Sequence, residues 1–265
     1  MPVPTTQIAG LTISRLICGS NPFLGYSYRS PAHNAWQRRH FTPERIADVL
    51  EKCLEVSITG LLANYEQERV MPRALEEVER RCGERPTWIA YVSGDDERLR
   101  EGIKSVAEDG AEACYIQCGT GDSCFSFSRT GKPLLDAGDT LDRLVEFTDL
   151  IHELGMPAGM GSHHWQIVRV MDERDYDVEF MVTTLNYLGV YCEYAGAVRA
   201  INTIDRPIIA IKTLGGNARI PPQDGLTCAF TGIKPGDVVA VGMEHEEAAE
   251  ENARLAEQII GYLGR

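Results

Sequence analysis

The sequence predicts a (β/α)8 barrel, and three observations support this fold class. Eight short apolar runs alternate along the chain with longer amphipathic segments. The runs are apolar at nearly every position, as expected for parallel strands buried on both faces, and the segments between them suit the helical crossovers that parallel pairing requires. No Ser-, Gly- or Pro-rich linker divides the 265 residues. We therefore expect residues 1–265 to form a single barrel domain.

The first half of the chain contains four strand–helix units. Thr42, Pro43 and Glu44 begin the first helix, because threonine caps a helix N-terminus, proline suits the first turn and an acid suits the positive end. Apolar residues at helical spacing continue this helix to Leu54, and Gly155 fits the end of the fourth helix. We expect the strands at 14–18, 58–63, 87–92 and 113–118, and the later helices near 70–81, 99–107 and 140–154.

The second half contains four more units of the same kind. A hairpin of residues 3–8 and 11–14, with Gly10 in its turn, is expected to cap the bottom of the barrel. A doubly wound open sheet is the alternative fold, but its Gly-x-Gly-x-x-Gly pattern does not follow the first strand. We expect the strands at 157–161, 180–185, 207–212 and 237–241, and the helices near 166–173, 193–203, 225–230 and 246–263.

The charge and cysteine content limit the partners and the compartment. Acidic residues number 39 against 26 basic ones, for a formal net charge of −13, which argues against binding to nucleic acid or to anionic membranes. Eight scattered cysteines indicate reduced, partly buried thiols rather than a disulfide framework. The N-terminus shows no signal-peptide pattern, and no run of 18 apolar residues predicts a transmembrane helix. We expect a cytoplasmic protein that acts on a small molecule.

Polar and aromatic side chains follow nearly every predicted strand. Because the active site of a (β/α)8 barrel lies at the C-terminal ends of its strands, these side chains are candidates for the site. The alternative for each is that it satisfies backbone groups of the loops, most of all for Asn21, Asn64 and Thr184. The predicted substrate-binding residues are Asn21, Asn64, Glu66, Tyr91, Gln117, Asp122, His164, Asn186 and Tyr187.

Three residues are the predicted catalytic groups: His163, Lys212 and Tyr65. A histidine serves as acid or base near neutral pH, and neighbouring side chains at a strand end point in different directions, so His163 and His164 have separate tasks. Lys212 ends an apolar strand, where an ammonium needs a carboxylate or a substrate group. A structural histidine and a salt bridge from the lysine to an acidic residue are the alternatives.

The segment 118–124, with the sequence CGTGDSC, raises the question of a metal. Cys118, Asp122 and His163 are weak candidates for zinc ligands, although their spacing matches no familiar zinc motif. The glycines of the same segment are instead compatible with an anion-binding turn. We expect no metal as the first choice and keep a divalent metal as an alternative.

The chain resembles the aldo/keto reductase superfamily over nearly its whole length. The resemblance lies in residues 13–16 with Gly19-x-Asn21-Pro22, in residues 159–163, in Asn186-Tyr187-Leu188, and in residues 239–243 with 249–252. It implies the barrel fold and an NADPH-dependent carbonyl reductase that uses an Asp, Tyr, Lys and His tetrad. The chain is most similar to members that lack this tetrad and bring no assigned reaction, and that likeness favours Asn21, His163, Asn186 and Lys212 as site residues.

The sequence departs from the pattern of the reductases. Leu62, Tyr91 and Gln117 stand near the positions of the tetrad aspartate, lysine and histidine, and Tyr65 alone stands near the tyrosine. The basic residues expected to bind the 2′-phosphate after the last strand are replaced by residues 244–247, with the sequence EHEE. Because glutamates repel a phosphate, we expect NADP(H) to be disfavoured and leave the cofactor unknown.

These observations favour an enzyme that acts on a small polar carbonyl- or sugar-like substrate by acid–base chemistry, as a lyase, isomerase or hydrolase. Asn, Gln, Tyr, His and Lys at the strand ends suit such a substrate. The alternatives are a divergent NAD(P)H-dependent oxidoreductase and a non-catalytic ligand-binding barrel. The aromatic segment 20–40 is expected to be an active-site lid, a contact in a homo-oligomer or a simple packed loop.

Overall fold

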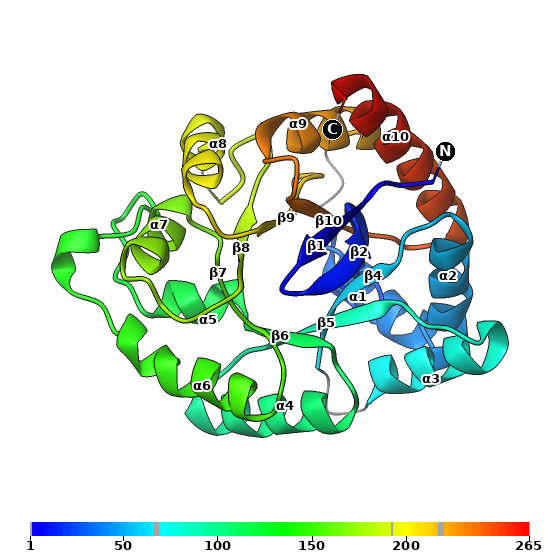
Figure 1. Ribbon diagram of the computed structural model, residues 1–265, viewed down its shortest axis with the longest axis horizontal. Helices are drawn as coiled ribbons and strands as arrows, with labels where there is room; N and C mark the ends of the chain where they lie inside the picture. The colour runs from blue at the N-terminus through cyan, green and yellow to red at the C-terminus, as the bar shows by residue number, and fades with distance from the viewer. Residues whose placement is uncertain (1, 66–68, 192, 217–219, 265) are drawn as a thin grey trace.

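The chain folds into a closed barrel of eight parallel strands, as a computed structural model shows for all residues except 1, 66–68, 192, 217–219 and 265 (Figure 1). The strand order is β10-β3-β4-β5-β6-β7-β8-β9, so each strand pairs with its neighbour in sequence and β10 closes the ring on β3. The doubly wound sheet is thereby excluded. The strands are β3 (Leu16–Gly19), β4 (Gly60–Asn64), β5 (Thr87–Val92), β6 (Ala113–Ile116), β7 (Ala158–Ser162), β8 (Phe180–Thr184), β9 (Ile208–Ile211) and β10 (Val238–Gly242).

Two apolar clusters bury the two faces of the barrel strands. Side chains such as Ile17, Ile89 and Ile209 fill the barrel interior, while Leu16 and Ala90 pack outward against the helices. Alternate residues of one strand therefore serve different cores, which is why the strands are apolar throughout. The β-branched and aromatic residues of these runs also favour extended backbone.

Helices surround the barrel in a ring (Figure 1). Thr42 caps α2 and Asp95 caps α4 by accepting a backbone hydrogen bond, and Pro43 occupies the first turn of α2 as the sequence predicts. The helices are α1 (Pro31–His40), α2 (Pro43–Glu55), α3 (Val70–Cys82), α4 (Asp96–Glu108), α5 (Cys118–Ser123), α6 (Val145–Glu153), α7 (Trp165–Glu173), α8 (Tyr194–Thr203), α9 (Pro222–Gly232) and α10 (Glu246–Leu263), with 3-10 turns at Leu135–Ala137 and Leu141–Leu144.

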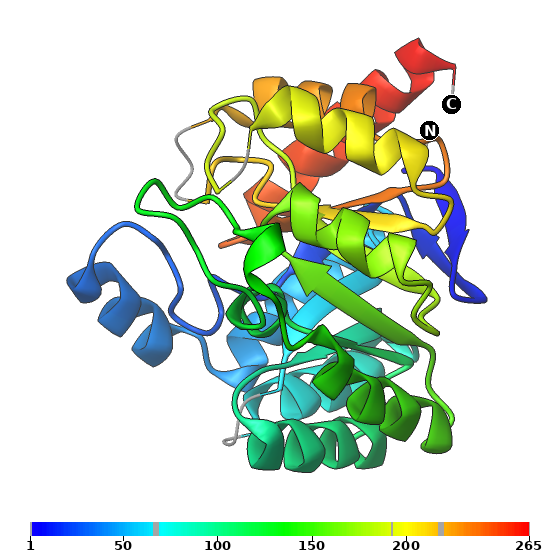
Figure 2. The ribbon, with the colours of Figure 1, turned by 90° about the vertical axis from the view of Figure 1, so that its left-hand side faces the viewer.

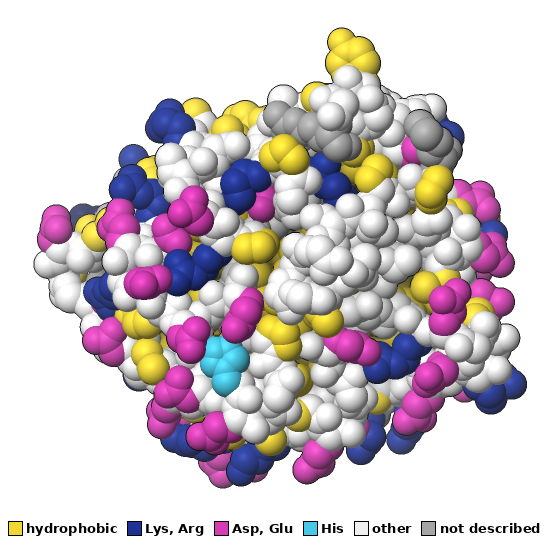
Figure 3. All heavy atoms as spheres, viewed as in Figure 1, with side chains coloured by type: hydrophobic (Ala, Val, Ile, Leu, Met, Phe, Trp, Pro, Cys, Tyr) yellow, Lys and Arg dark blue, Asp and Glu magenta, His cyan; other side chains and the backbone are white. Residues whose placement is uncertain are grey.

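The predicted hairpin forms and closes one end of the barrel. Strands β1 (Thr5–Ile8) and β2 (Leu11–Ser14) pair antiparallel, and Ile8 and Ile13 are fully buried in the interior cluster. Figure 2 shows the hairpin on the side of the barrel opposite α1. Positive and negative side chains are interspersed around the edge of the face that carries the hairpin (Figure 3). Because the hairpin closes the end of the barrel where the strands begin, the open end is the one where the strands finish.

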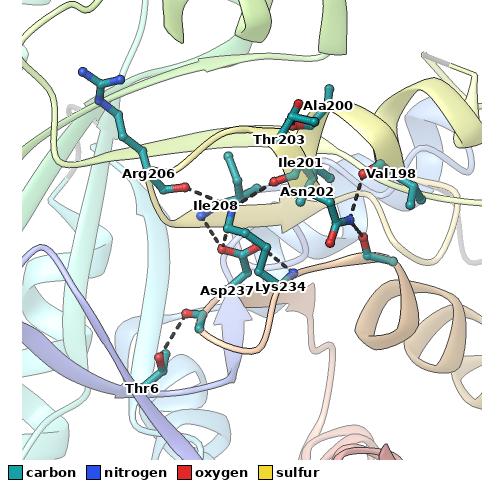
Figure 4. Close-up of polar contacts among 12 residues, drawn as sticks. Thr6, Val198, Ala200, Ile201, Asn202, Thr203, Arg206, Ile208, Lys234 and Asp237 are labelled. Atoms are coloured by element: carbon teal, nitrogen blue, oxygen red, sulfur yellow. Dashed lines mark hydrogen bonds and ion pairs between the residues drawn. The ribbon is translucent and has the colours of Figure 1, made fainter.

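A polar network joins β9 and β10 near the hairpin end (Figure 4). The buried carboxylate of Asp237 accepts hydrogen bonds from the backbone N–H groups of Ile208 (2.9 Å) and Lys234 (2.9 Å). The Lys234 ammonium lies 3.3 Å from the same carboxylate and donates to the carbonyls of Ile201 and Arg206. These bonds fix the last strand pair in register, because an unsatisfied buried N–H group is costly.

Two segments outside the predicted helices are helical. Residues 31–40 form α1, capped by Ser30 and begun by Pro31, and residues 118–123 form α5. The glycines of α5 therefore lie in a helical turn. Within the described residues, no helix is both long enough and apolar enough to cross a membrane.

Candidate functional site

A cavity of about 200 Å³ lies at the C-terminal ends of the barrel strands. The segment after β3 folds over it and supplies Asn21, Tyr26 and Tyr28 to its lining. Five of the residues predicted from the sequence line the cavity: Asn21, Tyr91, Gln117, His163 and Lys212. The fold therefore brings together side chains that are nearly 200 positions apart in the chain.

Lys212 follows the last residue of β9 in a left-handed backbone conformation, with φ of 58°. This conformation costs a non-glycine residue about 1–3 kcal/mol, so the surrounding structure must hold it. The ammonium lies 4.0 Å from the centroid of the Tyr28 ring and 5.9 Å from that of Tyr191. Burial lowers the pKa of Lys212. Among the described residues, no carboxylate forms an ion pair with this ammonium.

The Tyr28 hydroxyl oxygen accepts two hydrogen bonds at the cavity. One comes from the Lys212 ammonium, and the other comes from Asn21 Nδ2 at 2.9 Å. Asn21 is itself oriented by Tyr91, whose hydroxyl donates to Asn21 Oδ1 at 3.2 Å. Burial raises the pKa of Tyr28, and the hydrogen bond from Asn21 acts in the opposite direction. Because the Tyr28 oxygen is the acceptor in both hydrogen bonds, its hydroxyl proton is available to donate to a ligand.

A hydrogen-bonded pair of a carboxylate and an imidazole, Asp122 and His163, comes from α5 and from the residue after β7. His163 Nδ1 lies 2.7 Å from Asp122 Oδ2, and the His163 backbone N–H donates to Asp122 Oδ1 at 3.1 Å. The Ser162 hydroxyl also donates to Oδ1, at 2.5 Å. The Tyr191 ring stacks on the His163 imidazole with 4.6 Å between centroids. Asp122 is therefore fully used in orienting His163.

Glu244, two residues beyond β10, connects the end of the barrel to α1. Its Oε1 lies 2.8 Å from His33 Nε2 and accepts a hydrogen bond from Gln37 at 3.0 Å, and its Oε2 lies 3.6 Å from the Arg29 guanidinium. Partial burial acts to raise the pKa of Glu244, but the bonds from Gln37 and His33 and the charge of Arg29 outweigh it and lower this pKa. The carboxylate is thus neutralised by groups from the segment 29–37.

The other predicted site residues lie outside the cavity lining. Tyr65 packs against the outer core, and Asn64 contributes its backbone N–H to Ser20. His164 begins α7 with its ring 5.0 Å from that of Phe127, and burial lowers its pKa. Asn186 binds both backbone groups of Val190, Tyr187 is 44% exposed, and Glu66 lies outside the described residues.

The metal alternative finds no matching cluster of ligands. Cys118 is fully buried in the interior core, its Sγ lies 3.7 Å from the Val182 carbonyl, and burial raises the pKa of its thiol well above the usual value. Asp122 is already bonded to Ser162 and His163. In the part of the chain that the structure describes, no three His, Cys, Asp or Glu side chains are placed to hold a metal ion.

The structure adds Tyr28, Tyr191 and Glu244 to the predicted catalytic and binding residues. Tyr28 belongs to the aromatic segment 20–40, but its contact with Lys212 depends on how that segment folds back over the barrel. Left-handed backbone at Tyr28 (φ 58°) and Tyr191 (φ 71°) is also unpredictable from residue type, because tyrosine rarely adopts it. Glu244 is counted from the sequence as a free negative charge, whereas Arg29 and two residues of α1, His33 and Gln37, are its partners.

Comparison with solved structures shows the fold. A putative aldo-keto reductase from Pseudomonas aeruginosa superposes with a TM-score of 0.65 at 14% identity, over 97% of this chain and 94% of its own. An aldo-keto reductase from Klebsiella pneumoniae in complex with NADPH gives 0.62 at 10% identity, over 97% and 90%. An archaeal Rubisco gives 0.56 at 13%, over 95% and 60%. No protein-family model and no curated protein matches the sequence.

The expectation that NADP(H) is disfavoured is wrong. Aldo-keto reductases from Klebsiella pneumoniae that share this fold were solved with NADPH and with NADP. Glu244 pairs with Arg29 and His33, so its charge is not free to repel a phosphate. In the same stretch His245 Nδ1 lies 3.1 Å from Glu247 Oε2. The repulsion inferred from Glu244, the first residue of the stretch 244–247, is therefore compensated.

Proposed function

We propose that this protein is an NADP(H)-dependent oxidoreductase that interconverts a small carbonyl compound and the corresponding alcohol. One observation carries the proposal. The Tyr28 hydroxyl accepts hydrogen bonds from Lys212 and Asn21, and it has its own proton to donate into a cavity at the C-terminal ends of the strands of an aldo-keto reductase-like barrel. The solved barrels that hold NADPH favour this oxidoreductase alternative over the lyase, isomerase or hydrolase that the sequence analysis prefers.

The residues around the cavity fit a nicotinamide dinucleotide. Lys212 supplies a cation, and Gln37 Oε1 and Thr213 Oγ1 are buried oxygens without a hydrogen-bond partner among the described residues. The cavity is smaller than the roughly 300–1,000 Å³ of most ligand sites, so one end of the dinucleotide would lie inside it and the rest along its rim. When bound, the nicotinamide supplies or accepts the hydride.

Tyr28 supplies the proton that this reaction needs. Its hydroxyl donates to the carbonyl oxygen of the substrate and transfers the proton as that oxygen becomes an alkoxide. The phenolate left behind is stabilised by the Lys212 ammonium and by Asn21 Nδ2, while Tyr91 holds the Asn21 amide in place. Charge-assisted hydrogen bonds of this kind are about twice as strong as neutral ones.

The phenol of Tyr28 and the ammonium of Lys212 stand at chain positions that differ from those of the tetrad in the superfamily that the chain resembles. Leu62, Tyr91 and Gln117, which stand near three of the tetrad positions, all line the cavity. They bring no carboxylate, ammonium or imidazole to it. Tyr28 after β3 and Lys212 after β9 provide a phenol and an ammonium in their place.

The proposal is tested by cofactor binding and then by turnover. We expect NADPH at 100 times its dissociation constant to raise the free energy of unfolding by about 2.7 kcal/mol. We also expect the protein to consume NADPH with at least one member of a panel of small aldehydes and ketones, with the alcohol identified by NMR. If neither NADPH nor NADH stabilises the protein, the proposal is wrong. Stabilisation without turnover would favour a non-catalytic ligand-binding barrel.

A further inference from the structure

The cavity is lined by a second proton-carrying group that carbonyl reduction does not require. Reduction needs one proton, and Tyr28 supplies it. His163 lines the same cavity with its side chain 13% exposed and is held by Asp122. Tyr191 lies near both His163 and Lys212, because its ring stacks on the His163 imidazole and its centroid is 5.9 Å from the Lys212 ammonium.

Asp122 determines which nitrogen of His163 is free to react. The carboxylate accepts the proton of Nδ1 at 2.7 Å, so Nε2 of the neutral ring carries a lone pair. The Ser162 hydroxyl and the His163 backbone N–H hold the other carboxylate oxygen, which prevents Asp122 from turning away. Among the described residues, no group hydrogen-bonds to His163 Nε2. The arrangement is that of a general base oriented by a carboxylate.

We propose that the cavity also enolises 2-hydroxy carbonyl compounds, with His163 as the base and no net oxidation or reduction. His163 Nε2 removes the proton from the carbon that bears the hydroxyl group, and the C–H electron pair becomes the new C=C bond. The carbonyl oxygen takes the proton of Tyr28, which gives an enediol and a Tyr28 phenolate stabilised by Lys212.

The return steps balance the reaction. His163 gives its proton to the former carbonyl carbon, and the hydroxyl of the adjacent carbon gives its proton back to the Tyr28 phenolate as the new carbonyl forms. The products are an isomerised hydroxy carbonyl compound and an unchanged enzyme. Gln117 suits the second oxygen of such a substrate: its Oε1 accepts the backbone N–H of Gly119 at 2.6 Å, which leaves its amide Nε2 to donate.

The test measures exchange of the substrate's carbon-bound proton in D2O without any nicotinamide. Full-length protein is incubated with glycolaldehyde, glyceraldehyde, dihydroxyacetone, erythrulose and fructose, and 1H NMR follows the loss of the carbon-bound proton and the appearance of the isomer. We expect exchange above the buffer rate for at least one compound and a loss of about 100-fold or more in His163→Gln. His152→Gln is the matched control, because His152 also lies 3.1 Å from a carboxylate, that of Glu179, but outside the cavity.

The role of Asp122 as a positioning residue has its own readout. We expect 15N NMR to show His163 Nδ1 protonated and Nε2 unprotonated, and Asp122→Ala to abolish this preference while lowering the exchange rate. A merely structural role for Asp122 would leave the tautomer unchanged in folded protein.

The inference shares the cavity, Tyr28 and Lys212 with the proposed reduction, but it needs His163 and no nicotinamide, so the two fail separately. Exchange at the buffer rate for the whole panel, or undiminished exchange in His163→Gln, overturns the enolisation even if NADPH is consumed. Exchange that depends on His163 supports it even if NADPH neither binds nor reacts.

Discussion

The Lys212 ammonium donates a hydrogen bond to the Tyr28 hydroxyl and lies 4.0 Å from the centroid of the same ring. Both residues have a φ of 58°, in the left-handed region that non-glycine residues rarely adopt. Each such conformation costs about 1–3 kcal/mol and persists where the surrounding structure over-determines it, often at functional sites. The two strained positions meet at one phenol oxygen, which is the atom that the proposed reduction uses.

Replacing Tyr28 with phenylalanine removes the proposed proton donor and keeps the ring against Lys212. We expect kcat for carbonyl reduction to fall by about 100- to 10,000-fold, the range of general acid catalysis, while NADPH still stabilises the protein. Steady-state kinetics and thermal unfolding measure the two effects. Tyr262→Phe, on an exposed ring at the end of α10, should match the wild type. An unchanged kcat in Tyr28→Phe would exclude this role.

Lys212→Met should lower the reduction rate and change its pH dependence. Loss of a charge-assisted hydrogen bond worth about 1.5–3 kcal/mol corresponds to a decrease of about 10- to 160-fold. Burial lowers the pKa of Lys212 and raises that of Tyr28, so the ammonium loses its proton at a lower pH than usual and the phenol at a higher one. The wild-type rate should therefore begin to decrease at a pH below the usual pKa of lysine.

The methionine variant has no ammonium to lose, so its lower rate should stay flat until Tyr28 itself loses its proton. Profiles of kcat against pH, compared with those of the exposed control Lys104→Met, measure this difference. If Lys212→Met shows the same alkaline decrease as the wild type, Lys212 does not support Tyr28.

The strands could be predicted because each one is buried on both faces, so that burial alone defines them. Residues 87–92 show this best: the apolar run and strand β5 have the same bounds. The positions of His163 and Lys212 at the cavity could be predicted for the same reason, since a polar residue directly after a buried run lies at the end of a strand. Local sequence thus determined both the barrel and part of its cavity lining.

The covering segment could not be predicted from its hydrophobic pattern. Gln37 is the only residue of α1 that is buried, so α1 shows no apolar stripe of helical period. The signal that was available is Ser30-Pro31, a cap and first-turn pair like the Thr42-Pro43 that marked α2. The position of Tyr28 remained out of reach, because it depends on contacts across the barrel with Lys212.

Glu244→Gln should destabilise the attachment of α1 in a pH-dependent way. The folded-state pKa of Glu244 lies below its usual value, so its contribution to stability is present above the unfolded pKa of about 4.3 and is lost as the pH falls through the folded pKa. We expect Glu244→Gln to lower the free energy of unfolding by up to about 1 kcal/mol at neutral pH, because the carboxylate is partly exposed.

This difference from the wild type should shrink as the pH falls below about 4. Urea unfolding at neutral and acidic pH measures it, with the exposed Glu101→Gln as the control. A constant difference at both pH values would show that the charge of Glu244 does not stabilise the fold.

Gly121→Ala should disturb the support of His163 without changing any group in the cavity. Gly121 lies in α5 directly before Asp122, and a Cβ atom there would overlap the Gly161 carbonyl oxygen of β7 and lie 3.0 Å from Met171 Cε. Overpacking of this kind costs about 1–3 kcal/mol, and α5 can relieve it only by moving away from β7, which separates Asp122 from His163. We expect urea unfolding to show this loss and NMR to show a weakened preference for the Nδ1-protonated tautomer of His163.

The control is Gly261→Ala in α10, where a Cβ meets no atom within 4 Å, and this variant should instead stabilise the protein by up to about 1 kcal/mol. A Gly121→Ala protein with the stability and the His163 tautomer of the wild type would show that the contact between α5 and β7 does not position Asp122.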